Sequence, residues 1–190
     1  MPNKFFISDT HFCHSNILKF TDDSGNLIRG GKFSSIEEMN ETMIQNWNAV
    51  VKPQDKVYHL GDVFVGVQHQ DVATAIMTRL NGHKALYLGN HDHIKQPAYH
   101  KFRYIELWSG GRFKPHNFVC SHIPLRPDQM RNGEYNVHGH IHQNLVQKPL
   151  EYGDGPVPEY DPHYINVCVE HTNYTPVAFE DIIARIKQRS

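Results

Sequence analysis

Short apolar runs alternate along this chain with longer stretches in which apolar residues recur every three or four positions. The short runs have the length and the β-branched or aromatic content of buried strands. They lie at Lys4–Ser8, Lys56–Leu60, His83–Leu88, Arg103–Leu107, Asn117–Ser121, Tyr135–His138 and Tyr164–Val169. Strands that alternate with helical stretches are typical of an α/β architecture.

The clearest helical pattern covers about Ile36–Val51. Its apolar residues form one stripe at spacings of three and four: Ile36, Met39, Met43, Trp47 and Val50. Ser34 and Ser35 each precede a glutamate by three residues, so either serine can close a capping box. Two further helices are expected at Val72–Leu80 and Glu180–Arg189.

Two segments show no period. Thr21–Lys32 is polar and carries three glycines, and Leu145–Pro162 carries four prolines. We interpret both as loops, and loops of this length in a compact domain usually serve a function.

The size and composition of the chain exclude several classes of protein. Its 190 residues predict one domain over residues 1–190. Mean hydropathy is -0.57, and no window approaches the ~20 consecutive apolar residues of a membrane span, so no membrane partner is expected. A signal-peptide pattern is absent and the three cysteines are scattered, which predicts a reducing cytoplasm. Nineteen basic and twenty acidic residues leave a net charge of -1, so no global positive field attracts nucleic acid.

The chain has fifteen histidines, and several of them belong to five polar motifs that each begin where a predicted strand stops. The motifs are Asp9-Thr10-His11, Gly61-Asp62, Gly89-Asn90-His91-Asp92, Ser121-His122 and Gly139-His140-Ile141-His142. Each motif alone is more often a turn or a surface histidine than a ligand. Because the carboxyl ends of strands in an α/β sheet converge on one crevice, we expect all five motifs to lie together there.

These motifs offer imidazole, carboxylate and amide atoms without any thiolate. The candidate metal ligands are Asp9, His11, Asp62, Asn90, His122, His140 and His142. Seven ligands are too many for one ion, so we expect two divalent ions that share a bridging carboxylate, roughly 3.5–4 Å apart. Mixed nitrogen and oxygen ligands suit manganese, our first candidate, or iron, zinc or nickel, better than magnesium alone.

In this order, the five motifs resemble those of the calcineurin-like metallophosphoesterase family, and the resemblance runs from Asp9 to His142. It implies a two-sheet α-β-β-α sandwich with a dinuclear site at one edge. It also implies that one metal is held by Asp9, His11 and His142, that the other is held by Asn90, His122 and His140, and that Asp62 bridges them.

The resemblance further implies a reaction in which a bridging hydroxide attacks the phosphorus of a phosphate ester. His91 would be the non-ligand acid that protonates the leaving oxygen, and Asp92 would orient His91 by a hydrogen bond. One departure narrows the substrate class. The Ser/Thr protein phosphatases of this superfamily follow Gly-Asp with a segment ending in Asp-Arg-Gly, whereas Gly61-Asp62 continues here as Val63-Phe64-Val65-Gly66. This favours the compact branch that acts on nucleotides, nucleic acids or other phosphodiesters.

Two residues outside the motifs are candidate substrate contacts. His14 follows the first motif, with a local cap as the alternative role, and Arg126 follows His122 closely enough to reach a phosphate, with a solvated surface arginine as the alternative. From Lys95 to Arg131 there are seven basic and two acidic residues. Aromatic side chains that could stack on bases are interleaved with them: Tyr99, Tyr104, Trp108 and Phe113.

Two other functions stay open. The same machinery could serve a phosphomonoesterase that acts on a small metabolite or a phosphoprotein. A non-catalytic scaffold of the same fold is the second alternative, and it predicts missing ligands, whereas all seven are present. The sequence indicates no particular protein partner.

Overall fold

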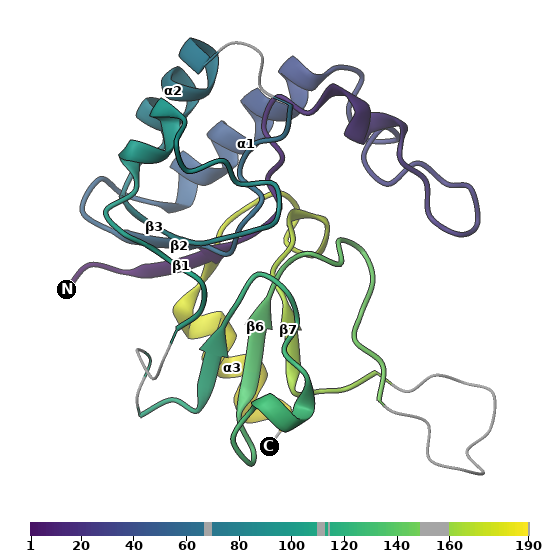
Figure 1. Ribbon diagram of the computed structural model, residues 1–190, viewed down its shortest axis with the longest axis vertical. Helices are drawn as coiled ribbons and strands as arrows, with labels where there is room; N and C mark the ends of the chain where they lie inside the picture. The colour runs from purple at the N-terminus through teal and green to yellow at the C-terminus, as the bar shows by residue number, and fades with distance from the viewer. Residues whose placement is uncertain (67–69, 110–112, 114, 149–159, 190) are drawn as a thin grey trace.

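The larger of two sheets is mixed and has five strands (Figure 1). The computed structural model describes residues 1–66, 70–109, 113, 115–148 and 160–189. The strand order is β4-β3-β2-β1-β8. The strands are β1 (Lys4–Ile7), β2 (Lys56–His59), β3 (His83–Tyr87), β4 (Ile105–Glu106) and β8 (Val177–Ala178). Neighbours among β1 to β4 pair in parallel, whereas β8 runs antiparallel to β1.

The smaller sheet is parallel and has the order β5-β6-β7. Its strands are β5 (Phe118–Cys120), β6 (Tyr135–His138) and β7 (Tyr164–Asn166), and all of their residues are buried. The two sheets meet where β1 ends. There, the amide of Ser8, the residue after β1, donates to the carbonyl of Val167, the residue after β7, at 3.0 Å. This junction brings the carboxyl ends of β1 and β7 side by side.

Three α-helices accompany the sheets: α1 (Ile36–Val50), α2 (Gln70–Arg79) and α3 (Phe179–Arg189). Short 3-10 helices lie at Ser15–Lys19, Pro97–Lys101, Pro127–Gln129 and Val169–His171. Ser35 caps α1, since its hydroxyl accepts from the Glu38 amide at 3.1 Å. The Glu38 carboxylate in turn accepts from the Ser34 amide at 2.8 Å, so both predicted serines take part in the cap.

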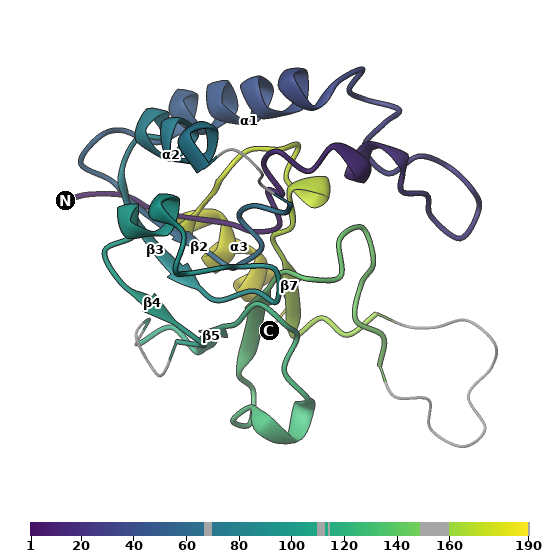
Figure 2. The ribbon, with the colours of Figure 1, turned by 45° about the horizontal axis from the view of Figure 1, so that its top comes forward.

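Two hydrophobic cores lie on opposite faces of the five-stranded sheet. On one face, α1 and α2 cover the sheet, and Trp47 of α1 packs in a core with Phe5, Val57 and Leu86 (Figure 2). On the other face, Phe6 belongs to the core that joins the two sheets, where alternate strand residues point away from the first core. Each fully buried large apolar side chain contributes about 1.5–3 kcal/mol, so the two cores hold the strand ends in place.

The α/β class is confirmed, and every predicted strand and helix has a counterpart whose ends differ by at most three residues. The specific α-β-β-α sandwich is not confirmed. Ile182 of α3 belongs to the core between the sheets, so α3 does not form a separate outer layer over β5-β6-β7. Strand β8 was not predicted, because two residues are too few to show a period.

The two predicted loops differ in how far they are described. Thr21–Lys32 contains neither an α-helix nor a strand, and a single antiparallel bridge joins Thr21 to Leu27. Of Leu145–Pro162, residues 149–159 lie outside the described residues. Among the residues described, no helix combines the length and hydropathy needed to cross a membrane.

We predict an acid-sensitive stability that originates in His59, the last residue of β2. Its ring is 1% exposed, stacks on Trp47 and contacts the Thr10 hydroxyl at 3.0 Å. Burial lowers its pKa from 6.5 to about 4. Below pH 6.5 this histidine is protonated in the unfolded chain, whereas in the folded chain it stays neutral down to about pH 4. The free energy of unfolding therefore falls as the pH drops from 6.5 to about 4. At about 1.4 kcal/mol per unit, the loss at this residue reaches roughly 3 kcal/mol.

Urea unfolding of the chelator-treated protein between pH 7.5 and 4.5 measures this loss. His59→Gln should show a smaller fall in unfolding free energy than the wild type, and the same change at exposed His100 is the matched control. An equal fall in wild type and His59→Gln would contradict the assignment.

Candidate metal centre

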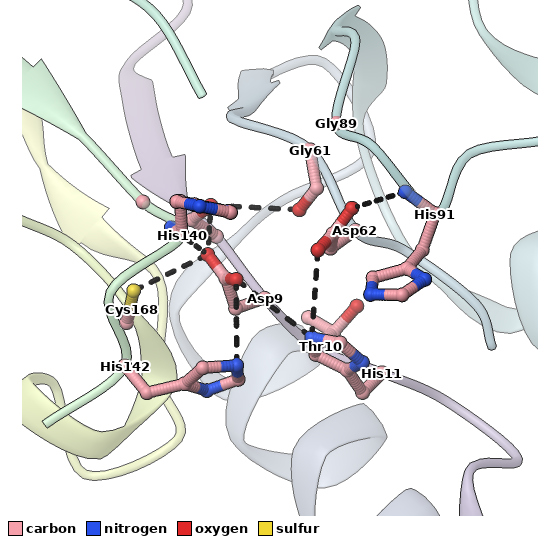
Figure 3. A network of polar contacts seen from close by, with 12 residues as sticks. Asp9, Thr10, His11, Gly61, Asp62, Gly89, His91, His140, His142 and Cys168 are labelled. Atoms are coloured by element: carbon pink, nitrogen blue, oxygen red, sulfur yellow. Dashed lines mark hydrogen bonds and ion pairs between the residues drawn. The ribbon is translucent and has the colours of Figure 1, made fainter. Parts of the chain in front are cut away.

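The five motifs converge at the carboxyl ends of β1, β2, β3, β5 and β6, as the parallel topology predicts. Main-chain hydrogen bonds join the loops to one another. The Asp9 amide donates to the Gly61 carbonyl at 3.0 Å, the His11 amide to the Asp62 carbonyl at 3.1 Å, and the Gly139 amide to the His122 carbonyl at 2.9 Å. The His140 amide also donates to Oδ2 of Asp9, and the His91 amide to Oδ1 of Asp62, both at 2.9 Å, so the loops form one connected rim (Figure 3).

A first group of ligand-type atoms comprises Asp9, His11 and His142, whose candidate atoms lie within 4.8 Å of one another. The Nε2 atom of His11 is 3.7 Å from Oδ1 of Asp9, and Nε2 of His142 is 3.9 Å from the same oxygen. Both rings point toward this carboxylate (Figure 3). We call these three residues the first subsite.

The second group comprises Asp62, His122 and His140, again within 4.8 Å. The Nε2 atom of His122 lies 3.4 Å from Oδ2 of Asp62 and 3.2 Å from Nδ1 of His140. Oδ1 of Asn90 is 3.0 Å from the same His122 nitrogen, so the predicted amide ligand lies beside this group. We call the four residues the second subsite.

Asp62 of the second subsite also borders the first subsite. Its Oδ2 atom is 3.7 Å from Nε2 of His11 in the first subsite and 3.4 Å from Nε2 of His122 in the second. Its other oxygen, Oδ1, accepts from the His91 amide at 2.9 Å, which fixes the carboxylate plane. One oxygen of this carboxylate therefore faces a histidine of each group.

The backbone of the rim is strained at most of the candidate ligands. Five of the seven have left-handed φ angles: Asp9 (57°), His11 (47°), Asp62 (56°), His140 (72°) and His142 (49°). A left-handed conformation costs roughly 1–2 kcal/mol for a residue other than glycine. Such strain persists only where the surrounding structure fixes it, and it clusters at functional sites.

Glycines in the motifs let the loops approach this closely. Gly61 has a φ of +95°, and a Cβ atom there would lie 2.6 Å from Nδ1 of His122. A Cβ atom on Gly139 would overlap the Ser8 hydroxyl and the carboxylate of Asp9. A side chain at either position would therefore displace a candidate ligand.

Both central carboxylates are ionised at neutral pH. Burial raises the pKa of Asp9, but contacts with three histidines, His11 foremost, outweigh burial and hold that pKa well below its ordinary value. The pKa of Asp62 is also lowered, because its contact with His122 outweighs burial. Two negative charges thus lie in one buried crevice.

The histidines differ in their affinity for protons. Burial lowers the pKa of His11 and of His140. Burial also opposes protonation of His122, but contact with Asp62 outweighs it and raises the pKa of His122. The pKa of His142 is raised as well, because its contact with the Glu170 carboxylate outweighs burial. A metal ion would compete with protons chiefly at His122 and His142.

The residues present fit divalent cations. Within the described part of the chain, Oδ1 of Asp9 and both ring nitrogens of His11 are buried and have no hydrogen-bond partner. Buried polar atoms are nearly always satisfied, so the Asp9 oxygen and Nε2 of His11, which face each other at 3.7 Å without a hydrogen bond, are suited to share a cation. Carboxylate, imidazole and amide donors suit manganese, iron, zinc or nickel.

The structure places His91 beside the first subsite and gives Asp92 other partners than expected. The His91 ring is exposed, and its centroid lies 5.7 Å from that of His11. The Asp92 carboxylate accepts from the amides of Asp62, Val63 and Gly89 at 2.8–2.9 Å and from the Tyr99 hydroxyl at 2.8 Å. The expected hydrogen bond from Asp92 to the His91 ring is therefore wrong. Asp92 instead holds the main chain of the second motif.

The candidate substrate contacts fall into two groups. His14 lies beside the centre, its ring centroid 5.5 Å from that of His11, and burial lowers its pKa to about 4. The Arg126 side chain is 82% exposed and pairs with Asp128 at 3.3 Å. Its contact with a substrate stays a prediction. Arg112 and Lys114 of the basic stretch lie outside the described residues.

The aromatic residues of that stretch are mostly core residues. Tyr99 is 1% exposed and Phe113 is 2% exposed, so neither can stack on a base. Tyr104 packs partly buried against the second core. Trp108 is 54% exposed, and it forms a bridge with Ser121, the residue before His122. Of the four, Trp108 is the one with an exposed side chain.

Sequence reasoning did not single out three residues that contact the candidate ligands. The Cys168 thiol donates to Oδ2 of Asp9 at 3.2 Å, and burial raises its pKa well above the ordinary value. Glu170 accepts from the His142 ring at 2.9 Å, and Arg29 contacts Glu170. Nothing in their local sequence signals these contacts, because each joins segments far apart in the chain.

Comparison with known proteins places the chain in a family. No family model matches the sequence. The uncharacterized protein MJ1445 of Methanocaldococcus jannaschii is 35% identical over 190 residues, which cover 99% of this chain and 93% of that protein. This chain belongs to the MJ1445 family. The Gene 66 protein of Mycobacterium phage L5 is 31% identical over 77% of this chain and 80% of its own length.

Solved structures show how far the fold of the MJ1445 family extends. A protein of unknown function from Aquifex aeolicus, AQ665, superimposes with a TM-score of 0.70 at 27% identity, over 97% of this chain and 99% of its own. The nuclease MPE of Pseudomonas putida superimposes with a TM-score of 0.44 at 16% identity, over 75% of this chain and 63% of its own. The first match covers both sheets and the candidate centre. The second is too distant to carry an argument about activity.

We predict that Asp62→Asn loses metal ions. An amide cannot supply the negative charge that two neighbouring cations would share, so both coordination spheres are weakened. After incubation with Mn²⁺ and gel filtration, metal analysis should find about two ions per wild-type chain and clearly fewer in the variant. Asp71→Asn, at an exposed position on α2, is the matched control. Full occupancy in Asp62→Asn would refute the bridging assignment.

Proposed function

We propose that this chain is a metal-dependent phosphoesterase of the calcineurin-like kind, with a dinuclear centre built from the two subsites. The observation that carries the proposal is the position of Asp62. One oxygen of this carboxylate lies 3.7 Å from a histidine of the first subsite and 3.4 Å from a histidine of the second. A carboxylate shared in this way supports two cations close together rather than two independent sites.

Two divalent ions bound there would neutralise the oxygens of a phosphate ester and lower the pKa of a water molecule to make a nucleophile. Asp9, His11 and His142 would hold one ion, and Asn90, His122 and His140 the other. Manganese is our first candidate because the donors are mixed nitrogen and oxygen atoms. The strained backbone holds the donors in place before any ion arrives, so little reorganisation accompanies binding.

The position of His91 supports a role in proton transfer. Its amide donates to Asp62 at 2.9 Å, while its ring is exposed and its centroid lies 5.7 Å from that of His11. Because the main chain of His91 is held and its ring is exposed, the ring could reach the leaving oxygen of an ester bound at the two subsites. We assign His91 the role of general acid toward the leaving group.

The substrate class that we propose is a phosphodiester of a nucleotide or a short nucleic acid. Trp108 supports it, because its side chain is exposed and its main chain forms a β-bridge with Ser121, the residue before His122. Base–aromatic stacking contributes about 1–3 kcal/mol per base. Seven basic residues against two acidic ones between Lys95 and Arg131 add local positive charge for the flanking phosphates.

His91→Ala should separate metal binding from catalysis. Because His91 is not a ligand in this account, the variant should keep its metal content while kcat falls by about 10²–10⁴-fold. Metal analysis and steady-state kinetics on the same preparation measure both quantities. His93→Ala, at an exposed position two residues further on, is the control. If His91→Ala lost one ion and its activity followed occupancy, His91 would be a ligand.

A substrate panel tests the reaction itself. With Mn²⁺ added, the wild type should cleave a p-nitrophenyl phosphodiester and short single-stranded nucleic acid faster than p-nitrophenyl phosphate. Trp108→Ala should raise KM for the nucleic acid roughly 5- to 100-fold, as the loss of one stacked base predicts. Arg126→Ala should raise the same KM through a lost phosphate contact.

Leu107→Ala is the control for Trp108, since Leu107 is 72% exposed beside it and cannot stack. Strong monoester turnover without diester cleavage, across several metals, would overturn the substrate class and favour a phosphomonoesterase. The absence of any hydrolysis by metal-loaded wild type would favour a non-catalytic scaffold.

A further inference from the structure

A buried chain of contacts reaches the first subsite from outside the candidate ligands. The Arg29 side chain is fully buried, and the Glu170 side chain is 6% exposed. The guanidinium donates from Nε to Oε1 of Glu170 at 2.8 Å, and its Nη2 lies 2.7 Å from the same oxygen. Oε1 also lies 2.9 Å from Nδ1 of His142. Arg29, Glu170 and His142 thus form one continuous network.

This network selects the ring nitrogen that His142 presents to a cation. An ionised carboxylate can only accept hydrogen bonds, so Nδ1 of His142 must carry the proton. The lone pair of a neutral ring then lies on Nε2, which is the nitrogen that faces Asp9 at 3.9 Å. A hydrogen bond at one ring nitrogen sets which nitrogen binds the metal, and it also fixes the plane of the ring.

The same guanidinium holds the first motif. Nη2 of Arg29 donates to the Asp9 carbonyl at 2.6 Å, and Nη1 donates to the Thr10 carbonyl at 3.1 Å. Asp9 is one of the strained residues, with a φ of 57°. The buried Arg29 guanidinium therefore fixes the backbone of Asp9 and, through Glu170, the ring of His142.

The second subsite has a weaker counterpart. Nδ1 of His122 lies 2.7 Å from the carbonyl oxygen of Leu60, a neutral acceptor. A carboxylate makes a stronger, charge-assisted hydrogen bond than a carbonyl does. The two subsites thus differ in how their histidines are held.

We propose that Glu170 and Arg29 are positioning residues of the first subsite, which set the tautomer and orientation of His142 and hold the Asp9 backbone. This proposal rests on one part of the proposed function, namely that the first subsite binds a metal ion. Neither residue touches the ion or the substrate. Their effect is a higher affinity of the first subsite for its ion.

Calorimetric titration of the folded protein with Mn²⁺ tests this role. The step that belongs to the first subsite is the one that His142→Ala removes. Glu170→Asp keeps the charge beside Arg29 but withdraws the carboxylate by one methylene from His142. We expect it to weaken that step about 10–100-fold, the usual effect of losing such a partner, and to leave the other step unchanged.

Two further variants separate positioning from general stability. Glu170→Gln keeps an acceptor oxygen at the same distance but removes its charge, so it should lose less affinity at that step than Glu170→Asp does. Glu41→Asp, in the exposed pair with Arg79, is the matched control and should leave both steps unchanged. Wild-type affinity in Glu170→Asp, or an equal loss at both steps, would overturn the proposal.

The ring tautomer gives a readout that needs no variant at Glu170. In the metal-free wild type at a pH where His142 is neutral, ¹⁵N NMR should find the proton on Nδ1, and a proton on Nε2 would overturn the proposal. A wild type that takes up no ion would contradict the proposed function, and the tautomer would still decide the role of Glu170.

Discussion

The structure around the candidate centre depends on the burial of one carboxylate. Asp9 is fully buried, and Oδ2 is satisfied by the Ser8 hydroxyl at 2.6 Å, the His140 amide at 2.9 Å and the Cys168 thiol at 3.2 Å. Oδ1 accepts no hydrogen bond from the described residues, and the His11 and His142 rings lie 3.7 and 3.9 Å from it. A buried charge is costly unless donors or a cation compensate it, so the protein has to bring several segments to this one side chain.

The topology supplies those segments. Parallel strands deliver loops from both sheets to one edge, and the contact of Ser8 with Val167 joins the sheets at that point. Asp62 then adds a second carboxylate 3.7 Å from the His11 ring, which increases the negative charge of the crevice. The left-handed backbone at five ligands is an energetic cost that the two hydrophobic cores and the connected main-chain hydrogen bonds offset.

Much of this arrangement could be predicted from local sequence. Strand ends are visible as the points where apolar runs stop, and the five motifs follow them. Predicting that they converge at the sheet edge therefore required only the rule for parallel strands.

The ion pair between Arg29 and Glu170 could not be predicted from the sequence. Arg29 and Glu170 are 141 positions apart, and neither has a periodic or motif context. Asp92 was assigned to His91 by proximity in sequence, whereas the fold brings it to the amides of Asp62 and Val63. Tyr99 and Phe113 were candidates for stacking on bases but are buried, because composition does not report which face of a segment is buried.

The central claim is that Asp62 joins two cation sites into one dinuclear centre. Anomalous diffraction from crystals grown with Mn²⁺ measures this directly. The account predicts two peaks roughly 3.5–4 Å apart, one beside Asp9, His11 and His142 and one beside Asn90, His122 and His140, with the Asp62 carboxylate between them. A single peak, or two peaks that Asp62 does not join, would contradict it.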